Sequence, residues 1–151
     1  MYTLKSMNED RPILPAVEWE KIVWEQTPYK GVFIHELERE MNPDNPKIPK
    51  YTVMALKMEP KAEILLHRHN RELGWTETIT LPNDGRFETQ GIEEGKIIAS
   101  ADSKIIVIHP GEIFGLKNID SKPLYFYSRM KPGFTGYGEI EEVKREKKSK
   151  H

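Results

Sequence analysis

Short apolar segments alternate with turn-forming residues along most of this chain, at a spacing of roughly ten residues. Residues 82–85, Pro-Asn-Asp-Gly, form the strongest turn signal, because Asn, Asp and Gly tolerate the positive backbone angle of a tight hairpin. Residues 109–112, His-Pro-Gly-Glu, indicate another turn. This pattern is typical of an all-β sandwich or barrel. We expect strands at residues 32–37, 51–58, 63–69, 77–81, 86–89, 95–99, 104–109 and 123–130, and a loop at the proline-rich residues 41–50.

Size and composition indicate one soluble globular domain. The chain has 151 residues, which is long enough to bury a substantial core without disulfides or a structural metal. It has no cysteine, so disulfides, thiolate ligands and a cysteine nucleophile are excluded. The 23 Lys and Arg residues nearly balance the 24 Asp and Glu residues, which gives no electrostatic reason to expect a nucleic-acid or membrane partner. The first residues contain no apolar segment typical of a signal peptide, and we expect a cytoplasmic protein.

We divide the chain into three parts. Residues 1–30 should form an arm without regular periodicity, in which Trp19 and Trp24 need burial against the main body or a partner subunit. Residues 31–134 should form the β-barrel. Residues 135–151 are dense in charge, and we expect a frayed tail whose basic end is solvated.

Two histidines, His67 and His69, stand two residues apart in the expected strand 63–69. Alternate side chains of a strand point to the same face, so the two imidazoles can converge on one point. A carboxylate a few residues later, Glu77 or Glu72, can turn back toward them. Two imidazoles and a carboxylate suit a divalent metal such as Fe, Mn, Ni or Zn. The alternative is that both rings are ordinary strand residues that make common hydrogen bonds.

The order of these segments resembles the cupin superfamily, whose members are RmlC-like jelly-roll β-barrels. The first motif of that family contains a glycine, a His-x-His pair, a glutamate and a second glycine. Here His67 and His69 match the pair, and Glu77 matches the glutamate if the loop before it is longer than usual. Lys61 stands where the first glycine is expected. The resemblance implies a metal site of His67, His69 and Glu77, with Glu72 as the alternative carboxylate.

The second motif of the family is a Pro-Gly turn followed by a histidine and an asparagine. Residues 106–118 supply the apolar strand, the Pro-Gly turn and Asn118, but Phe114 replaces the last metal-binding histidine. His109 precedes the turn, where it can reach the site only if it faces inward. The resemblance covers roughly residues 50–131 and implies a homodimer whose barrels bind a small molecule.

Tyr125, Tyr127 and Arg129 alternate on the last expected strand and therefore share one face. If that face lines the barrel, Arg129 could clamp an anionic substrate, and the tyrosines could serve as hydrogen-bond donors or acid/base groups. If it faces a partner, the same residues are interface anchors. The sequence favours neither alternative, and these three residues are our candidates for catalytic groups.

Three functions are compatible with these features. The first is a metal-dependent enzyme, oxygenase- or isomerase-like, that acts on a small organic substrate. The second is a metal-free cupin that binds a sugar-like or other small ligand, as a sensor or a non-metal isomerase, because Phe114 offers a ring for stacking. The third is an interaction domain that pairs subunits through the face containing Trp19 and Trp24.

Overall fold

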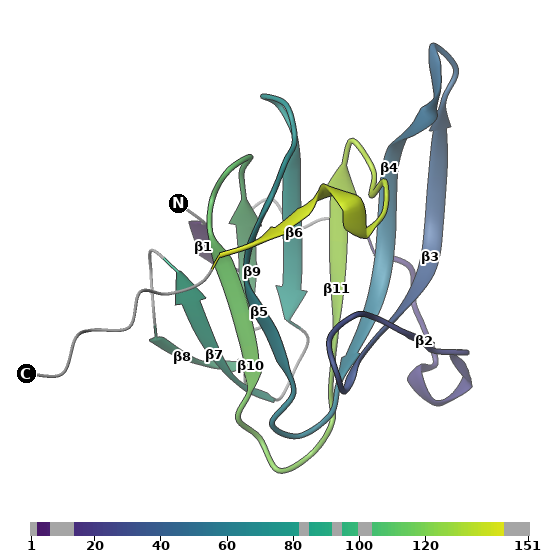
Figure 1. The fold of residues 1–151 in the computed structure, drawn as a ribbon. Coiled ribbons are helices and arrows are strands. Elements are labelled where there is room, and N and C mark those ends of the chain that lie inside the picture. Colours follow the sequence, from purple (N-terminus) through teal and green to yellow (C-terminus); the bar gives the residue numbers. More distant parts are fainter. Residues whose placement is uncertain (1–2, 7–13, 82–84, 92–94, 100–103, 144–151) are drawn as a thin grey trace, which may run out of the picture.

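Two antiparallel β-sheets face each other in this protein (Figure 1). The computed structural model describes residues 3–6, 14–81, 85–91, 95–99 and 104–143. The larger sheet has the strand order β1-β9-β6-β11-β4-β3-β2, and the smaller has the order β12-β5-β10-β7-β8. The predicted all-β jelly-roll architecture is confirmed. The strands are β1 (Thr3–Ser6), β2 (Glu25–Gln26), β3 (Val32–Asn42), β4 (Asn45–Met58), β5 (Glu63–His69), β6 (Thr76–Leu81), β7 (Gly85–Gly91), β8 (Gly95–Ala99), β9 (Lys104–Ile108), β10 (Phe114–Asn118), β11 (Leu124–Lys131) and β12 (Ile140–Glu142).

Apolar side chains from both sheets fill the space between them. Along β11, every second residue from Leu124 to Met130 is buried, which is the alternation expected of a strand with one face on the core. Phe126 of this strand meets Phe87 of β7 edge to face, with ring centroids 5.9 Å apart. The two sheets therefore share one hydrophobic core. Its largest fully buried members are Trp75, Phe87, Phe114, Phe126, Met58, Leu81, Ile106, Ile108, Leu116 and Leu124.

The long β3–β4 hairpin replaces the loop predicted at residues 41–50. Its pairing continues as far as Asn42 opposite Asn45, and Met41 is opposite Pro49. The register shifts around these residues, and such irregularities let a strand accept prolines that cannot donate a ladder hydrogen bond. The loop prediction is therefore wrong, because it treated proline as incompatible with pairing.

The N-terminal arm supplies both edge strands of the larger sheet. β1 pairs with β9, β2 pairs with β3, and a single 3-10 turn, η1 (Trp19–Lys21), lies between them in the chain. The ring of Trp19 lies 5.4 Å from that of Tyr125 and 5.1 Å from that of Tyr127. Trp24 lies 6.0 Å from Tyr125. The two tryptophans were expected to pack on the main body or on a partner subunit. The contacts seen here are with β11 of the main body.

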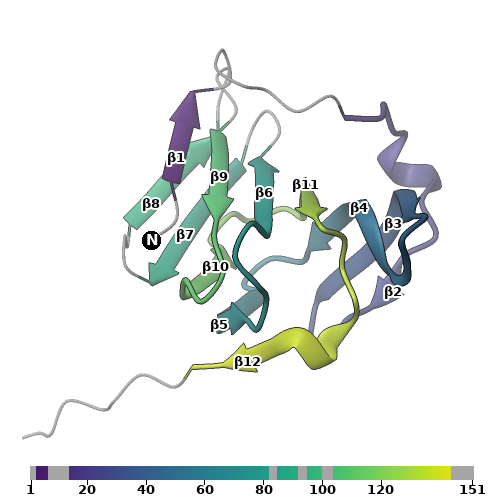
Figure 2. The same cartoon turned by 90° about the horizontal axis from the view of Figure 1, so that it is seen from above.

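Residues 132–143 form a segment that we call the C-terminal strap. It contains the 3-10 turn η2 (Tyr137–Glu139) and β12, which pairs with β5. Figure 2 shows this segment, in yellow, running beside β5 at the edge of the molecule. Over residues 135–143 the prediction of a frayed tail is corrected, because these residues form η2 and β12 and share backbone hydrogen bonds with residues 66–70. Residues 144–151 lie outside the described residues. Within the described ranges, no helix is long and apolar enough to cross a membrane.

Candidate functional site

β5 directs His67 and His69 into the space between the sheets. Their exposed fractions are only 5% and 4%. The intervening Arg68 points outward, where its guanidinium pairs with Glu141 at 2.7 Å. The two histidines therefore lie on the same, inward face of β5.

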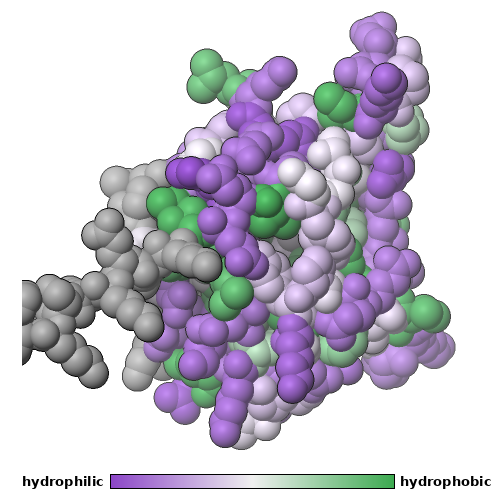
Figure 3. All heavy atoms as spheres, viewed as in Figure 1, coloured by the Kyte–Doolittle hydropathy of each residue, from purple (hydrophilic) through white to green (hydrophobic). Residues whose placement is uncertain are grey.

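Both histidines line a cavity of about 70 Å³ between the sheets. Most of its wall is apolar, and the polar groups are few. On the face seen in Figure 3, hydrophobic side chains are visible between mostly hydrophilic ones. Three strap residues, Phe134, Tyr137 and Ile140, form part of the wall. The remaining lining residues are Thr27, Tyr29, Val32, Ile34, Met54, Leu56, Ile64, Glu77, Ile79, Phe114, Phe126, Ser128 and Met130.

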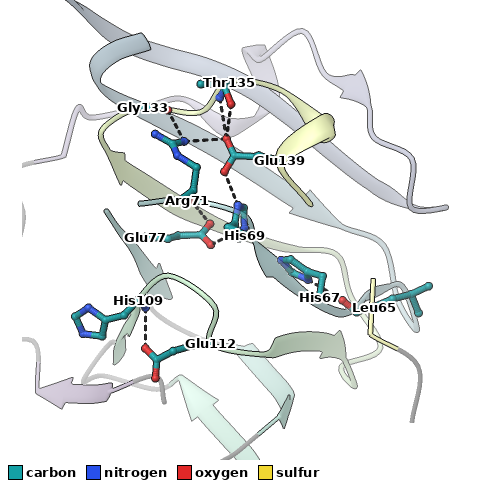
Figure 4. A network of polar contacts seen from close by, with 11 residues as sticks. Leu65, His67, His69, Arg71, Glu77, His109, Glu112, Gly133, Thr135 and Glu139 are labelled. Atoms are coloured by element: carbon teal, nitrogen blue, oxygen red, sulfur yellow. Dashed lines mark hydrogen bonds and ion pairs between the residues drawn. The ribbon is translucent and has the colours of Figure 1, made fainter. Parts of the chain in front are cut away.

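His69 lies between two buried carboxylates (Figure 4). On one side, its Nδ1 is 2.6 Å from Glu139 Oε2. On the other side, its Nε2 is 3.5 Å from Glu77 Oε1. Its ring also stacks on Trp75, with centroids 4.7 Å apart. These contacts fix both the position and the plane of the imidazole.

Glu139 is itself held by several donors. Its Oε1 accepts hydrogen bonds from Arg71 NH1, from the Thr135 backbone N–H and from the Thr135 hydroxyl, each at 2.9 Å. Burial alone would raise the pKa of Glu139, but the hydrogen bonds from His69 and Thr135 and the charge of Arg71 hold that pKa below its usual value. Glu139 is therefore an ionised carboxylate at neutral pH.

Glu77 approaches His69 from β6. Its Oε2 accepts a hydrogen bond of 2.5 Å from the Ser128 hydroxyl of the neighbouring strand β11. This contact leaves Oε1 directed toward His69. The structure therefore places Glu77 beside the histidine pair, whereas Glu72 is exposed in the loop between β5 and β6.

In His67, as in His69, the Nδ1 atom contacts an oxygen acceptor. Its Nδ1 lies 2.7 Å from the Leu65 carbonyl oxygen, which can only accept, so Nδ1 carries the proton and Nε2 is left as an acceptor. Burial lowers the pKa of His67, and this effect outweighs the opposing hydrogen bond to Leu65. The ring is therefore neutral at neutral pH.

The donor atoms fit a divalent metal in part. Two ligands about 2.1 Å from a tetrahedral ion lie about 3.4 Å from each other, and the spacing of His69 Nε2 and Glu77 Oε1 is 3.5 Å. Metal-binding histidines also commonly have their second nitrogen bonded to a carboxylate or carbonyl, as His67 and His69 do here. However, among the described residues no three His, Asp or Glu side chains are close enough together to hold one ion.

By the sequence resemblance, Phe114 stands in place of the family's last metal-binding histidine. It is buried, it pairs with His67 across β10 and β5, and it lines the cavity. His109 is exposed, and its backbone N–H donates to Glu112 at 2.7 Å. It lies away from the other two histidines (Figure 4).

Tyr125, Tyr127 and Arg129 share one face, but the cavity is lined by the residues between them, Phe126 and Ser128. The two tyrosines contact the tryptophans of the arm. Arg129 lies over the ring of Tyr51, 5.1 Å from its centroid. Their catalytic role stays a prediction, and their position is outside the barrel cavity.

Sequence reasoning missed Glu139, Arg71 and Ser128. Glu139 lies in a charge-dense segment that resembles a solvated tail, so no local pattern distinguishes it from its neighbours. Ser128 could have been found, because it alternates with Tyr127 and Arg129 and therefore faces the other side of β11.

At the sequence level, no protein-family model and no curated protein matches this chain. Solved structures do match it. The polyketide cyclase RemF from Streptomyces resistomycificus is 13% identical, with a TM-score of 0.60 over 89% of this chain and 88% of that one. A Klebsiella pneumoniae protein with a double-stranded β-helix domain is 15% identical, with a TM-score of 0.58 over 88% and 100%. The cupin domain of Schizosaccharomyces pombe Cnp3 is 12% identical, with a TM-score of 0.57 over 78% and 73%. At these identities the matches establish the architecture alone, and the protein has the cupin fold.

Proposed function

We propose that this cupin-fold protein binds a divalent metal and a small, largely apolar organic molecule in its barrel cavity. The metal would be held by the Nε2 atoms of His67 and His69 and by Glu77. The observation that supports this proposal is the orientation of the two rings. Each Nδ1 is bonded to an acceptor outside the cavity, so Nε2 is the ring nitrogen left to bind a metal whenever the ring is neutral.

The contact between His69 and Glu77 favours a bound cation. When Nδ1 of His69 carries the only ring proton, Nε2 and Glu77 Oε1 are two acceptors 3.5 Å apart in a buried site. Two buried acceptors that face each other are unfavourable unless a proton or a cation lies between them. A metal would satisfy both at once, and His67 would have to move toward them to complete the set.

A set of two histidines and one carboxylate with open positions suits ferrous iron. A metal there would supply Lewis-acid or redox chemistry to a substrate in the open positions. Glu139 and Leu65 would orient the histidine ligands, and Ser128 would orient the carboxylate. This chemistry agrees with an oxygenase- or isomerase-like reaction.

The cavity indicates the class of substrate. A water molecule needs roughly 10–15 Å³ of such a volume, so about 70 Å³ holds only a few water-sized groups. Apolar side chains supply most of the wall. A sugar would leave most of its hydroxyl groups without partners there, which is costly for buried polar groups. We therefore favour a short, mainly apolar molecule with one polar end at the histidines.

The second candidate is a metal-free small-ligand site, and Phe114 is the observation that favours it. A buried phenyl ring at the position of a metal ligand keeps that side of the cavity apolar. In that case a proton rather than a metal would lie between His69 and Glu77. The predicted homodimer would be compatible with either candidate.

Elemental analysis of protein purified without an affinity tag tests the first candidate. We expect about one metal per chain, and its loss in His67→Ala and His69→Ala. His35→Ala is the matched control, because His35 lies on the outside of β3, with its Nδ1 3.1 Å from the Val23 carbonyl oxygen. Protein that stays metal-free after refolding with iron, manganese, nickel and zinc would refute metal binding. An organic ligand whose thermal shift is unchanged by chelator would then support the second candidate.

A further inference from the structure

The C-terminal strap places one carboxylate behind His69, outside the cavity: Glu139, whose Oε2 is 2.6 Å from Nδ1 of His69. We propose that Glu139 is a positioning residue that sets which nitrogen of His69 carries the proton. Nδ1 is protonated, and the Nε2 lone pair faces Glu77 and the cavity. The consequence for metal binding rests on the proposed function, but the placement of the proton does not.

The donor and acceptor properties of the two groups set this placement. An ionised carboxylate has no hydrogen to donate, and a neutral imidazole has one N–H and one acceptor nitrogen. With a carboxylate oxygen 2.6 Å from Nδ1, the proton must be on Nδ1. Arg71, 2.9 Å from the other oxygen of Glu139, balances the buried negative charge. The strap therefore supplies the group that leaves Nε2 free.

The surroundings of Glu139 Oε1 make the effect testable by a near-isosteric substitution. This oxygen accepts three hydrogen bonds, one from Arg71 and two from Thr135. In Glu139→Gln the amide nitrogen cannot take that position, because its own hydrogens would face three donors. The amide nitrogen must therefore face His69 and donate to Nδ1. Nδ1 then becomes the acceptor, and the ring proton moves to Nε2, toward Glu77.

Backbone contacts hold the strap independently of this side chain. The backbone N–H of Asn70 donates to the Glu139 carbonyl at 2.7 Å, and β12 pairs with β5. Glu139→Gln should therefore leave the strap in place. Glu141 is the matched control on the same strap, because its exposed carboxylate pairs with Arg68 outside the barrel. Glu141→Gln removes the same charge without touching His69.

The test is nitrogen NMR of histidine-labelled, metal-free protein at alkaline pH, with the His69 signals assigned from a His69→Asn variant. In wild-type protein and in Glu141→Gln we expect Nδ1 to be protonated and Nε2 to be bare. In Glu139→Gln we expect the opposite pattern, with Nε2 protonated and Nδ1 bare. A wild-type His69 with its proton on Nε2, or with protons on both nitrogens, would overturn the proposal without any variant. Retention of the wild-type pattern in Glu139→Gln would overturn it as well.

Zinc titration of the same proteins tests the consequence. Loss of an outer partner of a metal-binding histidine typically lowers metal affinity by about 10- to 100-fold, and we expect this loss in Glu139→Gln but not in Glu141→Gln. If no protein binds zinc while the NMR signals behave as expected, the metal site fails and the positioning role stands. If zinc binds equally to all three proteins and the signals do not exchange, the positioning role fails and the metal site stands.

Discussion

Phe114→His would test whether the apolar wall of the cavity is a lost ligand position. Phe114 pairs with His67 across β10 and β5, and both side chains line the same cavity. An imidazole at this position would therefore project toward His67, His69 and Glu77. It would raise the number of donors around the proposed ion from three to four, which closes a tetrahedral site.

The structure also gives the cost of this substitution in the absence of metal. Phe114 is almost fully buried, with 1% of its surface exposed. Burial of a phenylalanine side chain contributes about 1.5–3 kcal/mol, and most of this is lost when a polar ring replaces it. For a chain of this length, such a loss lowers the melting temperature by roughly 3–12 °C. We therefore expect metal-free Phe114→His to melt several degrees below wild type.

Zinc should reverse this loss. At a free concentration of about 100 times Kd, a ligand that binds only the folded state stabilises it by about 2.7 kcal/mol. The measurement is the melting temperature of each protein with and without zinc. Phe87→His is the matched control, because Phe87 is equally buried on the adjacent strand β7 but does not line the cavity. If zinc stabilises Phe114→His no more than Phe87→His, position 114 does not face the proposed ion, and the reasoning fails.

Three further predictions concern the barrel around the site. A Cβ at Gly133 would lie 2.8 Å from atoms of β4, whereas a Cβ at Gly138 would meet nothing within 4 Å. In chemical denaturation, Gly133→Ala should therefore lower the free energy of unfolding by about 1–3 kcal/mol, and Gly138→Ala should change it little. The hydrogen bond to Glu38 raises the pKa of Tyr51 to about 12. The contribution of this hydrogen bond to stability is therefore fully present below the pKa of an unfolded tyrosine, at pH ~10. It is lost as the pH rises through the pKa of Tyr51 in the folded protein. In an ultraviolet titration, Glu38→Gln should lower that pKa, and an unchanged curve would contradict the assignment. Lys61 has a positive φ of 69°. Lys61→Gly should at least preserve the melting temperature, because glycine adopts this left-handed conformation without steric strain, which offsets its entropy cost. A clear drop in melting temperature would refute this.

The fold could be predicted because its signals are local and repeated. Strand alternation and turn residues recur along the chain, and the shared face of His67 and His69 follows from strand geometry. The positive φ of Lys61 agrees with the glycine expected at that position. The choice between Glu77 and Glu72 could not be made from the sequence, because it depends on where the loop ends and β6 begins. In the structure Glu77 pairs with Met130 of β11 and lies 3.5 Å from His69, whereas Glu72 is exposed in the loop; which carboxylate binds a metal stays a prediction.

Glu139, which contacts His69 from outside the cavity, could not be predicted for a different reason. Glu139 precedes a strand of only three residues, too short to produce a periodic pattern, and its burial depends on contacts with Arg71 and with β5, far away in the chain. A carboxylate in a charged segment is usually solvated. Only tertiary structure distinguishes Glu139 from the exposed Glu141 two residues later.

Glu77 has opposing roles in the empty cavity and in the proposed metal site. This leads to a last prediction, in which Glu77→Gln changes stability and metal affinity in opposite directions. If His69 Nε2 is an acceptor, Glu77 Oε1 faces it at 3.5 Å without a hydrogen between them. In Glu77→Gln the amide nitrogen can donate to Nε2, while the amide oxygen keeps the hydrogen bond from Ser128. A new buried hydrogen bond contributes about 0.5–1.5 kcal/mol, so metal-free Glu77→Gln should be more stable than wild type. It should also bind zinc more weakly, because a neutral amide is a poorer ligand than a carboxylate. Chemical denaturation with and without zinc measures both effects. A metal-free Glu77→Gln that is less stable than wild type would mean that His69 carries a proton on each nitrogen and pairs with both carboxylates, which would exclude a bare Nε2 in the empty cavity.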